Sequence, residues 1–211
     1  MIQKGCGKMQ GDWKKKLEYF WMYYKIPLFA ALFVLAAAGY FLYTKATEKE
    51  YALNAMLLDV HTDVAEGILE EEFVVYAGID TKKYDVLIAT SLLLADGTSN
   101  YAMACQSRFY GLVGAGELDV GMMLEENFAS FAGADAFLDL REVFTEEELA
   151  AFPELYRDSG GRVLGVYGDE LAKIREIDGY ADPDTRSVAG IIYNSRHMET
   201  AKQFLLYLSE E

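Results

Sequence analysis

Cysteine, proline and histidine are scarce in this 211-residue sequence, which holds two, three and two of them. Two cysteines cannot build a disulfide framework. The few prolines, together with 52% hydrophobic and 14% aromatic residues, exclude a largely disordered or collagen-like chain. Basic residues are also few, 19 against 34 acidic ones, and the resulting charge of −15 disfavours phosphate backbones. The composition therefore predicts a folded domain that does not bind nucleic acid.

Motifs of several enzyme classes are absent from the sequence. His61 and His197 do not form the HExxH pair of a zinc hydrolase, and no G-x-S-x-G nucleophile motif occurs. The cluster Gly111-Leu-Val-Gly114-Ala-Gly116 closes a predicted helix instead of following a strand, unlike a phosphate-binding loop. We therefore expect no enzyme activity, no cofactor and no metal. A hydrolase ranks third among the functional hypotheses, after a binding module and a structural domain.

Three short stretches of the sequence are rich in acidic residues. Glu70-Glu71-Glu72 and Glu146-Glu147-Glu148 are interpreted as solvated helix faces. The loop DGYADPDT, residues 178–185, offers three aspartates to a calcium ion but lacks the closing Glu of an EF-hand. We interpret it as an acidic turn.

The longest uncharged run, 19 residues, is Ile26–Thr44. As a helix it is about 28 Å long, close to the roughly 30 Å thickness of the hydrocarbon layer. Aromatic residues lie at both ends, as in interfacial belts. The run predicts a single transmembrane helix over 26–44, and a buried core helix is the alternative.

The lysines predict how this helix is oriented. Residues 1–25 hold six lysines against Asp12 and Glu18, a charge of +4, which leaves −19 for the remainder. By the positive-inside rule, 1–25 is a cytoplasmic basic leader, 45–50 a linker and 51–211 an extracytoplasmic domain. Cys6 and Cys105 then lie on opposite sides of the cell membrane. The alternative is a signal peptide that is cleaved off. The apolar run is longer than the apolar region of a signal peptide, which argues against this alternative.

Strand-like and helical patterns alternate through the predicted outer domain. Between the predicted strands, apolar residues at helical spacing or capping residues indicate helices. A capping box at Thr145 begins one of these helices. Cys105 lies on an apolar helical stripe and is predicted to be buried and unpaired. This alternation predicts an α/β fold, a mainly parallel sheet with flanking helices. The predicted strands are Ala52–Val60, Tyr84–Ala89, Asp119–Leu124, Val163–Tyr167 and Val188–Tyr193.

Two stretches resemble a known family. The first, within Gln106–Glu142, contains the turn Ala115-Gly116-Glu117-Leu118-Asp119-Val120 and ends in Ala136-Phe137-Leu138-Asp139-Leu140. The second, Gly190–Leu205, contains Asn194-Ser195 before a predicted helix. Together they resemble the extracellular solute-binding proteins of the type 2 periplasmic-binding fold. Members of that family bind a ligand between two lobes.

The chain departs from this family in length. The second lobe would be inserted at Arg141–Ser187, where only 47 residues are present. The resemblance therefore implies one lobe, with the first strand between the second and the third. It also implies that Val188–Tyr193 returns beside the third strand and brings Asn194 and Ser195 to the same edge as Glu125 and Glu126. A ligand there would stay exposed, so we expect affinity no better than roughly micromolar.

Ligands of open α/β sheets bind at the carboxyl ends of the strands, so the loops that follow them supply the candidate site. Caps and turns are the alternative interpretation of these residues. The sequence predicts a membrane-anchored, solute-binding-like module that serves a transporter or sensor. The alternative is a degenerate interaction or structural domain without a small-molecule ligand. Expected partners are the bilayer and a small solute or membrane transport protein. The candidate ligand-binding residues are Asp59, His61, Thr90, Ser91, Glu125, Glu126, Asn127, Asn194 and Ser195.

Overall fold

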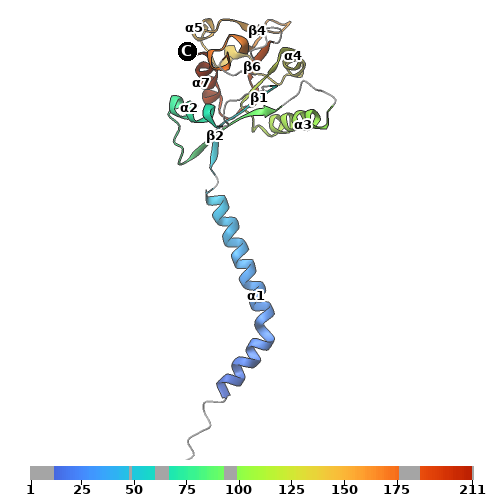
Figure 1. The fold of residues 1–211 in the computed structure, drawn as a ribbon, viewed down its shortest axis with the longest axis vertical. Helices are drawn as coiled ribbons and strands as arrows, with labels where there is room; N and C mark the ends of the chain where they lie inside the picture. The colour runs from blue at the N-terminus through green and yellow to red at the C-terminus, as the bar shows by residue number, and fades with distance from the viewer. Residues whose placement is uncertain (1–11, 48, 60–66, 93–98, 176–185, 211) are drawn as a thin grey trace, which may run out of the picture. The chain divides into compact units, whose positions relative to one another are not determined.

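The computed structural model describes residues 12–47, 49–59, 67–92, 99–175 and 186–210 (Figure 1). The chain divides into two compact units, Met1–Glu48 and Lys49–Glu211. Cys6, His61 and the acidic loop at 178–185 lie outside the described residues, so the predictions about them stay predictions.

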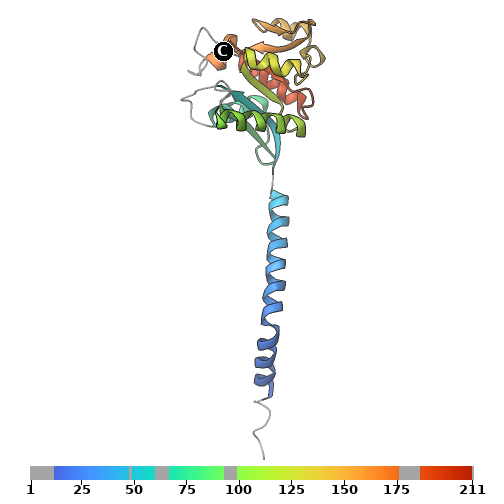
Figure 2. The same ribbon diagram turned by 90° about the vertical axis from the view of Figure 1, so that its right-hand side faces the viewer.

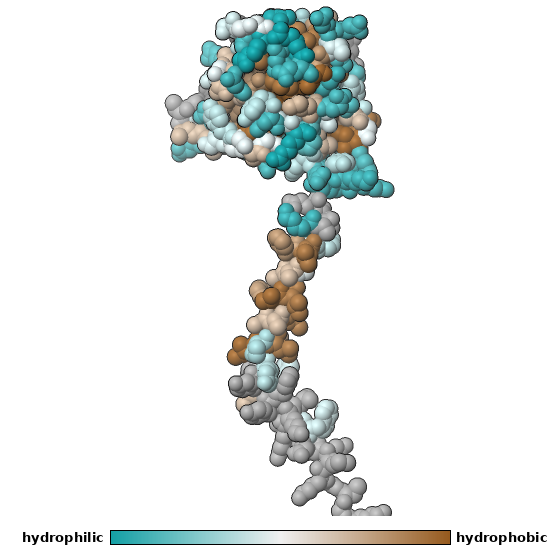
Figure 3. Space-filling model, turned by 180° about the vertical axis from the view of Figure 1, so that it is seen from behind, coloured by the Kyte–Doolittle hydropathy of each residue, from teal (hydrophilic) through white to brown (hydrophobic). Residues whose placement is uncertain are grey.

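The first unit is built around one helix, α1 (Asp12–Thr47). Within it, Ile26–Lys45 has a mean hydropathy of 2.0 and is the one span among the described residues that is long and apolar enough to cross a membrane. Figure 3 shows these hydrophobic residues along the helix, and their side chains are exposed. The predicted apolar helix is therefore present, and it starts well before the apolar run itself.

The second unit contains a six-stranded sheet in the order β2-β1-β3-β6-β5-β4. β1 pairs in parallel with β2 on one side and with β3 on the other, as predicted. β6 lies beside β3, also as predicted. The strands are β1 (Glu50–Leu58), β2 (Tyr84–Leu92), β3 (Val120–Leu124), β4 (Leu155–Arg157), β5 (Val163–Tyr167) and β6 (Ser187–Ile191).

The prediction of a mainly parallel sheet is wrong for half of the strands. β6 is antiparallel to β3, β5 to β6 and β4 to β5. The reason lies in the connections: β5 ends and β6 begins at the same edge, so the chain between them does not cross the sheet. The sheet is therefore mixed, with a parallel half made by β2, β1 and β3.

Helices cover both faces of the sheet (Figure 1). Residues of α2 (Ile68–Ala77), α6 (Ala172–Arg175) and α7 (Met198–Ser209) pack in one hydrophobic cluster. Residues of α3 (Asn100–Ala115) and α4 (Glu125–Gly133) pack in a second cluster. Figure 2 looks onto the side that carries α3 and α4. The flanking helices are thus confirmed, and the short α5 (Glu146–Ala150), η1 (Leu140–Glu142) and η2 (Gly168–Glu170) complete the unit.

The alternation of side chains along β1 explains the two clusters. Leu53, Ala55 and Leu57 belong to the cluster under α2 and α7, whereas Met56 and Leu58 belong to the cluster under α3 and α4. Successive residues of a strand point to opposite faces, so an apolar run with no polar alternation is buried on both sides.

Local capping residues set several helix ends. The Ser99 side chain accepts a hydrogen bond from the Ala102 N–H at the start of α3. Thr145 and Glu148 form the predicted capping box of α5. Gly78 ends α2 with a φ of 65°, a left-handed conformation that glycine adopts without steric cost. Cys105 on α3 is buried and outside any disulfide, as predicted.

A side chain on α2 accepts a hydrogen bond from the outer edge of the sheet. β2 is an end strand of the sheet. Its Ile88 N–H donates to Oε1 of Glu70, on α2, over 3.2 Å. A backbone donor that would face an unoccupied edge therefore has a partner within the same chain.

Candidate functional site

Several strands of the sheet end at one edge, which we call the carboxyl edge. The parallel strands β1, β2 and β3 end there. β5 also ends there, and β6 and β4 begin there, because each runs antiparallel to its neighbour. This is the edge at which open α/β sheets bind ligands. The polar residues that the structure brings there are Asp59, Glu125, Asn127, Glu154, Tyr167, Asp169, Arg186 and Ser187.

Two of the predicted site residues meet directly. Asn127, in the first turn of α4, donates through Nδ2 to Oδ2 of Asp59, directly after β1, over 3.4 Å. Asp59 is buried and has a φ of 66°. For a residue other than glycine this left-handed backbone costs of order 1 kcal/mol, so the surrounding structure must hold it. The carboxylate is thus fixed at the carboxyl edge by the fold.

A tyrosine joins β5 to the start of α4. The Tyr167 hydroxyl donates to Oε1 of Glu125 over 2.8 Å. Burial, followed by the hydrogen bond to Glu125, raises the pKa of Tyr167 to about 12. The hydroxyl therefore stays protonated at neutral pH and remains a donor to the carboxylate.

Arg186 connects three elements at the same edge. Its Nη2 lies 2.6 Å from Oε2 of Glu154, its Nε lies 3.3 Å from Oδ2 of Asp169, and its guanidinium lies 3.6 Å from the centre of the Tyr167 ring. The Glu154 carboxylate raises the pKa of Arg186 above its ordinary value, and Arg186 lowers the pKa of Glu154 in return. One guanidinium thus orders two carboxylates and an aromatic ring.

Two buried polar atoms near Arg186 have no hydrogen-bond partner among the described residues. They are the Ser187 Oγ and the Asp169 Oδ1. Ser187 is only 1% exposed, and a Cβ added at Gly168 would lie 2.5 Å from its hydroxyl. A buried polar group without a partner costs about 1–3 kcal/mol. Both atoms are enclosed within the carboxyl edge.

The other predicted residues of this edge lie in its surroundings. Glu126 is exposed in the first turn of α4, next to Glu125. Thr90 is half-buried near the end of β2, and Ser91 follows it in the same strand. His61 lies outside the described residues.

Asn194 and Ser195 are not at the carboxyl edge, and the prediction that they lie beside Glu125 is wrong. Because β6 is antiparallel to β3, Ser187 pairs with Leu124, and the far end of β6 lies where β3 begins. Asn194 accordingly donates through Nδ2 to the carbonyl of Val113, at the end of α3, over 2.8 Å. We call this opposite side the amino edge.

Ser195 takes part in a buried cluster at the amino edge. The Asp119 carboxylate is 1% exposed. It accepts hydrogen bonds from the Asn54 N–H at 2.9 Å and the Ser195 hydroxyl at 2.6 Å, and His197 Nδ1 lies 3.2 Å from it. The serine bonds to the aspartate and not to the imidazole, so this is not the arrangement of a nucleophilic triad. The cluster anchors the segment between β6 and α7 to β1.

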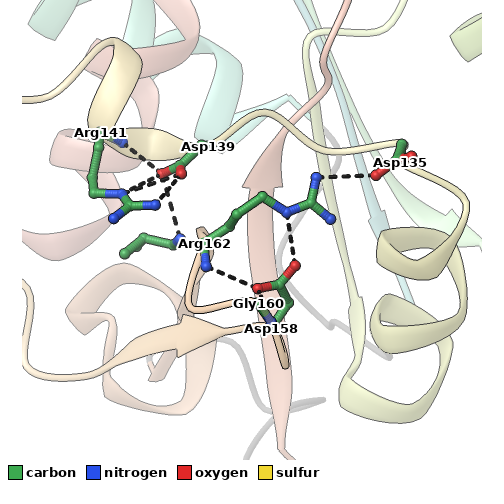
Figure 4. Close-up of polar contacts among 7 residues, drawn as sticks. Asp135, Asp139, Arg141, Asp158, Gly160 and Arg162 are labelled. Atoms are coloured by element: carbon green, nitrogen blue, oxygen red, sulfur yellow. Dashed lines mark hydrogen bonds and ion pairs between the residues drawn. The ribbon is translucent and has the colours of Figure 1, made fainter.

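A second set of charges braces the β4–β5 hairpin, also at the amino edge (Figure 4). Arg162 forms ion pairs with Asp158 at 2.7 Å and with Asp135 at 3.0 Å. Arg141 pairs with Asp139, and this contact lowers the pKa of the Asp139 carboxyl. These acids are neutralised by neighbouring arginines, so the geometry points to a structural role.

Sequence reasoning missed five residues of the carboxyl edge: Glu154, Tyr167, Asp169, Arg186 and Ser187. The sequence could have placed Tyr167 at an edge of the sheet, because it is the last residue of the predicted strand Val163–Tyr167. Arg186 directly precedes the strand that starts at Ser187, but nothing in the pattern pairs it with Glu154, 32 residues earlier. Such pairs depend on the strand order and not on local periodicity.

The arrangement at the carboxyl edge offers mainly acceptors. The carboxylates of Asp59 and Glu125 can accept hydrogen bonds from groups that carry N–H or O–H donors. Among the described residues, no group of three His, Cys, Asp or Glu side chains is placed to hold a metal ion. Comparison with protein-family models, with curated proteins and with solved structures finds no match to this chain.

Proposed function

We propose that Lys49–Glu211 is a ligand-binding module of the solute-binding type, held at the outer face of the cell membrane by α1. In this proposal a small polar solute binds at the carboxyl edge without being chemically changed. The module serves a transporter or a sensor in the same membrane.

The observation that carries the proposal is the placement of Asp59, Glu125 and Asn127. Two of these residues come from one helix turn and the third lies at the end of β1, yet the fold brings them to one edge. The strand order β2-β1-β3 with β6 beside β3 agrees with what the family resemblance implies and supports the same proposal.

Thermal unfolding of the full chain in detergent micelles tests solute binding. Amino acids, sugars and polyamines are the probes, each at a concentration far above micromolar. A ligand present at 100 times its Kd stabilises the folded state by about 2.7 kcal/mol, which is readily seen as a higher unfolding temperature. Asp59→Asn and Glu125→Gln should abolish the shift, whereas Glu146→Gln on α5 should preserve it.

The same experiment separates the proposal from its alternative. A panel in which no probe raises the unfolding temperature would contradict solute binding and favour a structural or interaction domain without a small ligand. A shift that survives both Asp59→Asn and Glu125→Gln would place the ligand away from the carboxyl edge.

The proposed location has its own test. Protease added to intact cells or spheroplasts should digest residues after the apolar helix and leave the basic leader protected, because the lysines favour the cytoplasmic side. Protection of the folded unit instead would reverse the proposed orientation.

A further inference from the structure

Three neighbouring strands present glycines to the face of the sheet that α3 and α4 cover. Gly121 on β3 pairs directly with Gly190 on β6. Gly165 on β5 precedes Val166, whose partner on β6 is Ala189, so the register brings Gly165 next to Gly190. We call Gly121, Gly190 and Gly165 the glycine row below.

Phenylalanine rings occupy the space above the glycine row. A Cβ added at Gly190 or at Gly165 would lie 2.9 Å from Cζ of Phe128, and one at Gly121 would lie 3.1 Å from Cε2 of Phe109. Cβ atoms in proteins do not approach other heavy atoms within 3.0 Å. The fully buried ring of Phe128 therefore rests on the backbone of β5 and β6, and a side chain at Gly190 or Gly165 would push it away.

Neighbouring rings hold Phe128 in this place. Phe137 stacks on it with ring centroids 4.0 Å apart and an interplanar angle of 15°. Tyr156, which pairs with Gly165, meets it edge-on with ring centroids 5.0 Å apart. Stacked and edge-to-face contacts each favour a particular orientation of the two rings. Phe128 is therefore fixed in orientation as well as in position.

Phe128 lies one helical turn after Glu125 on α4. Residues three positions apart are neighbours on a helix surface, so the side of α4 that rests on the glycine row also carries Glu125. β3 leads directly into α4, and the Glu125 N–H donates to the Arg186 carbonyl over 2.9 Å. These contacts fix where the helix begins. The contact of Phe128 with the sheet is a second point, which fixes the direction of the helix.

We infer that Phe128 and the glycine row are positioning residues of the candidate site, because they set the direction of α4 and with it the places of Glu125 and Asn127. That these two side chains bind a solute rests on the proposed function. Their placement by Phe128 does not depend on it. A solute then meets a first turn of α4 that is already in place, so binding does not have to order this turn.

Contact with α3 is the other way in which α4 could be positioned. The ring of Phe131 on α4 lies 4.6 Å from that of Phe109 and 5.0 Å from that of Tyr110, both on α3, measured between centroids. Phe131 is buried, like Phe128, and lies nearly one turn further along the helix. It is therefore the matched control, a buried phenylalanine of the same helix whose ring partners are on α3.

The titration of Tyr167 reports where Glu125 lies, because its pKa of about 12 arises from burial and then from the hydrogen bond to Glu125. Nuclear magnetic resonance of the full chain in micelles, with tyrosine labelled at the phenolic carbon, measures this pKa, and Tyr167→Phe identifies the resonance. Glu125→Gln gives the lower pKa expected when the carboxylate is lost. The pKa in Phe128→Leu should fall most of the way to that lower value, whereas in Phe131→Leu it should stay at about 12.

Gly190→Ala tests the same contact from the sheet. Its Cβ would lie 2.9 Å from Phe128 and 2.6 Å from the Leu164 carbonyl oxygen, so the ring should be displaced and the pKa of Tyr167 should fall as in Phe128→Leu. Gly133→Ala, on α4 with no atom within 4 Å of the added Cβ, is the control and should leave this pKa unchanged. Where Gly190→Ala does not fold, Phe128→Leu decides alone.

The outcomes separate this inference from the proposed function. An unchanged pKa of Tyr167 in Phe128→Leu overturns the positioning role. Equal falls in Phe128→Leu and Phe131→Leu also overturn it, because they would show that any loss of core packing moves Glu125. Solutes that leave the unfolding temperature unchanged contradict the proposed function and do not affect the titration. Where a solute raises that temperature, Phe128→Leu should remove most of the rise and Phe131→Leu should keep it.

Discussion

Acidic side chains at the two edges of the sheet have different partners. At the amino edge, Asp139 and Asp158 are paired with arginines, and the buried Asp119 is held by hydrogen bonds with three residues. At the carboxyl edge, Arg186 is shared between Glu154 and Asp169. At the amino edge, Asp139 and Asp158 thus each have an arginine partner. At the carboxyl edge, two carboxylates share one arginine.

Glu125 makes the difference clearest. Its described partner is the neutral hydroxyl of Tyr167, so its negative charge remains. In the proposed function, polar groups at the amino edge stabilise the fold, whereas those at the carboxyl edge bind a ligand. Substitutions at the two edges should accordingly change different properties.

The largest effect is expected at the amino edge. Asp119→Ala removes a buried acceptor and leaves the Asn54 N–H and the Ser195 hydroxyl without it, so the free energy of unfolding should fall by about 3 kcal/mol. Denaturant unfolding of the full chain in micelles measures this loss. Asp135→Asn, which affects an exposed ion pair, is the control and should cost less than about 0.5 kcal/mol. Equal losses of unfolding free energy in both variants would show that the buried Asp119 stabilises the fold no more than the exposed Asp135 does.

At the carboxyl edge, Tyr167 should make stability depend on alkaline pH. Its pKa is about 12 in the folded state and 10.0 ordinarily, so the unfolded state releases the proton first. Its contribution is complete below pH 10 and is lost as pH rises to about 12. The loss relative to Tyr167→Phe should reach about 2 kcal/mol. Identical pH profiles for both proteins would show that the hydroxyl is not held by Glu125.

Removing the shared arginine should have a smaller effect. Arg186→Ala leaves Glu154 and Asp169 close together without their cation and removes the contact with the Tyr167 ring. Because these groups are partly exposed, we expect a loss of about 1–2 kcal/mol in unfolding free energy. Arg186→Lys should recover part of it, since lysine restores the charge but not the planar fork. A loss as large as that of Asp119→Ala would mean that this edge, too, is primarily structural.

The smallest effect is expected for the hairpin brace. Arg141 lowers the pKa of Asp139, so this carboxylate stabilises the fold above its ordinary pKa of 3.8 and loses that contribution as pH falls through the lowered value. Asp139→Asn should remove this acidic component and cost less than about 1 kcal/mol at neutral pH. Unfolding midpoints of both proteins from neutral to acidic pH provide the measurement. A variant that keeps the full acid sensitivity would assign it to other carboxylates.

Much of the fold could be predicted from local pattern. Val163–Tyr167 is β5 as the structure has it, and Ser99, Gly78 and the Thr145 capping box mark helix ends. These features depend on residues within a few positions of one another. The three-residue β4 escaped prediction because it is recognisable only by its pairing with β5.

The candidate site was predictable in part, for the same physical reason. Asp59, Glu125 and Asn127 follow parallel strands, and parallel strands end together, so their placement follows from strand order. The placement of Asn194 and Ser195 depended on the direction of β6. That direction is set by the route of the chain after β5, which no periodicity in the sequence specifies.

The contact between Glu70 and Ile88 also bears on how the protein avoids aggregation. Val86–Leu92 of β2 is an uncharged run of apolar and small hydroxyl residues at the end of the sheet, the kind of strand that templates cross-β growth. An incoming strand would need the Ile88 N–H, which Glu70 already occupies with a charged group. The Glu70 carboxylate on α2 therefore removes one of the backbone donors with which such a strand would pair.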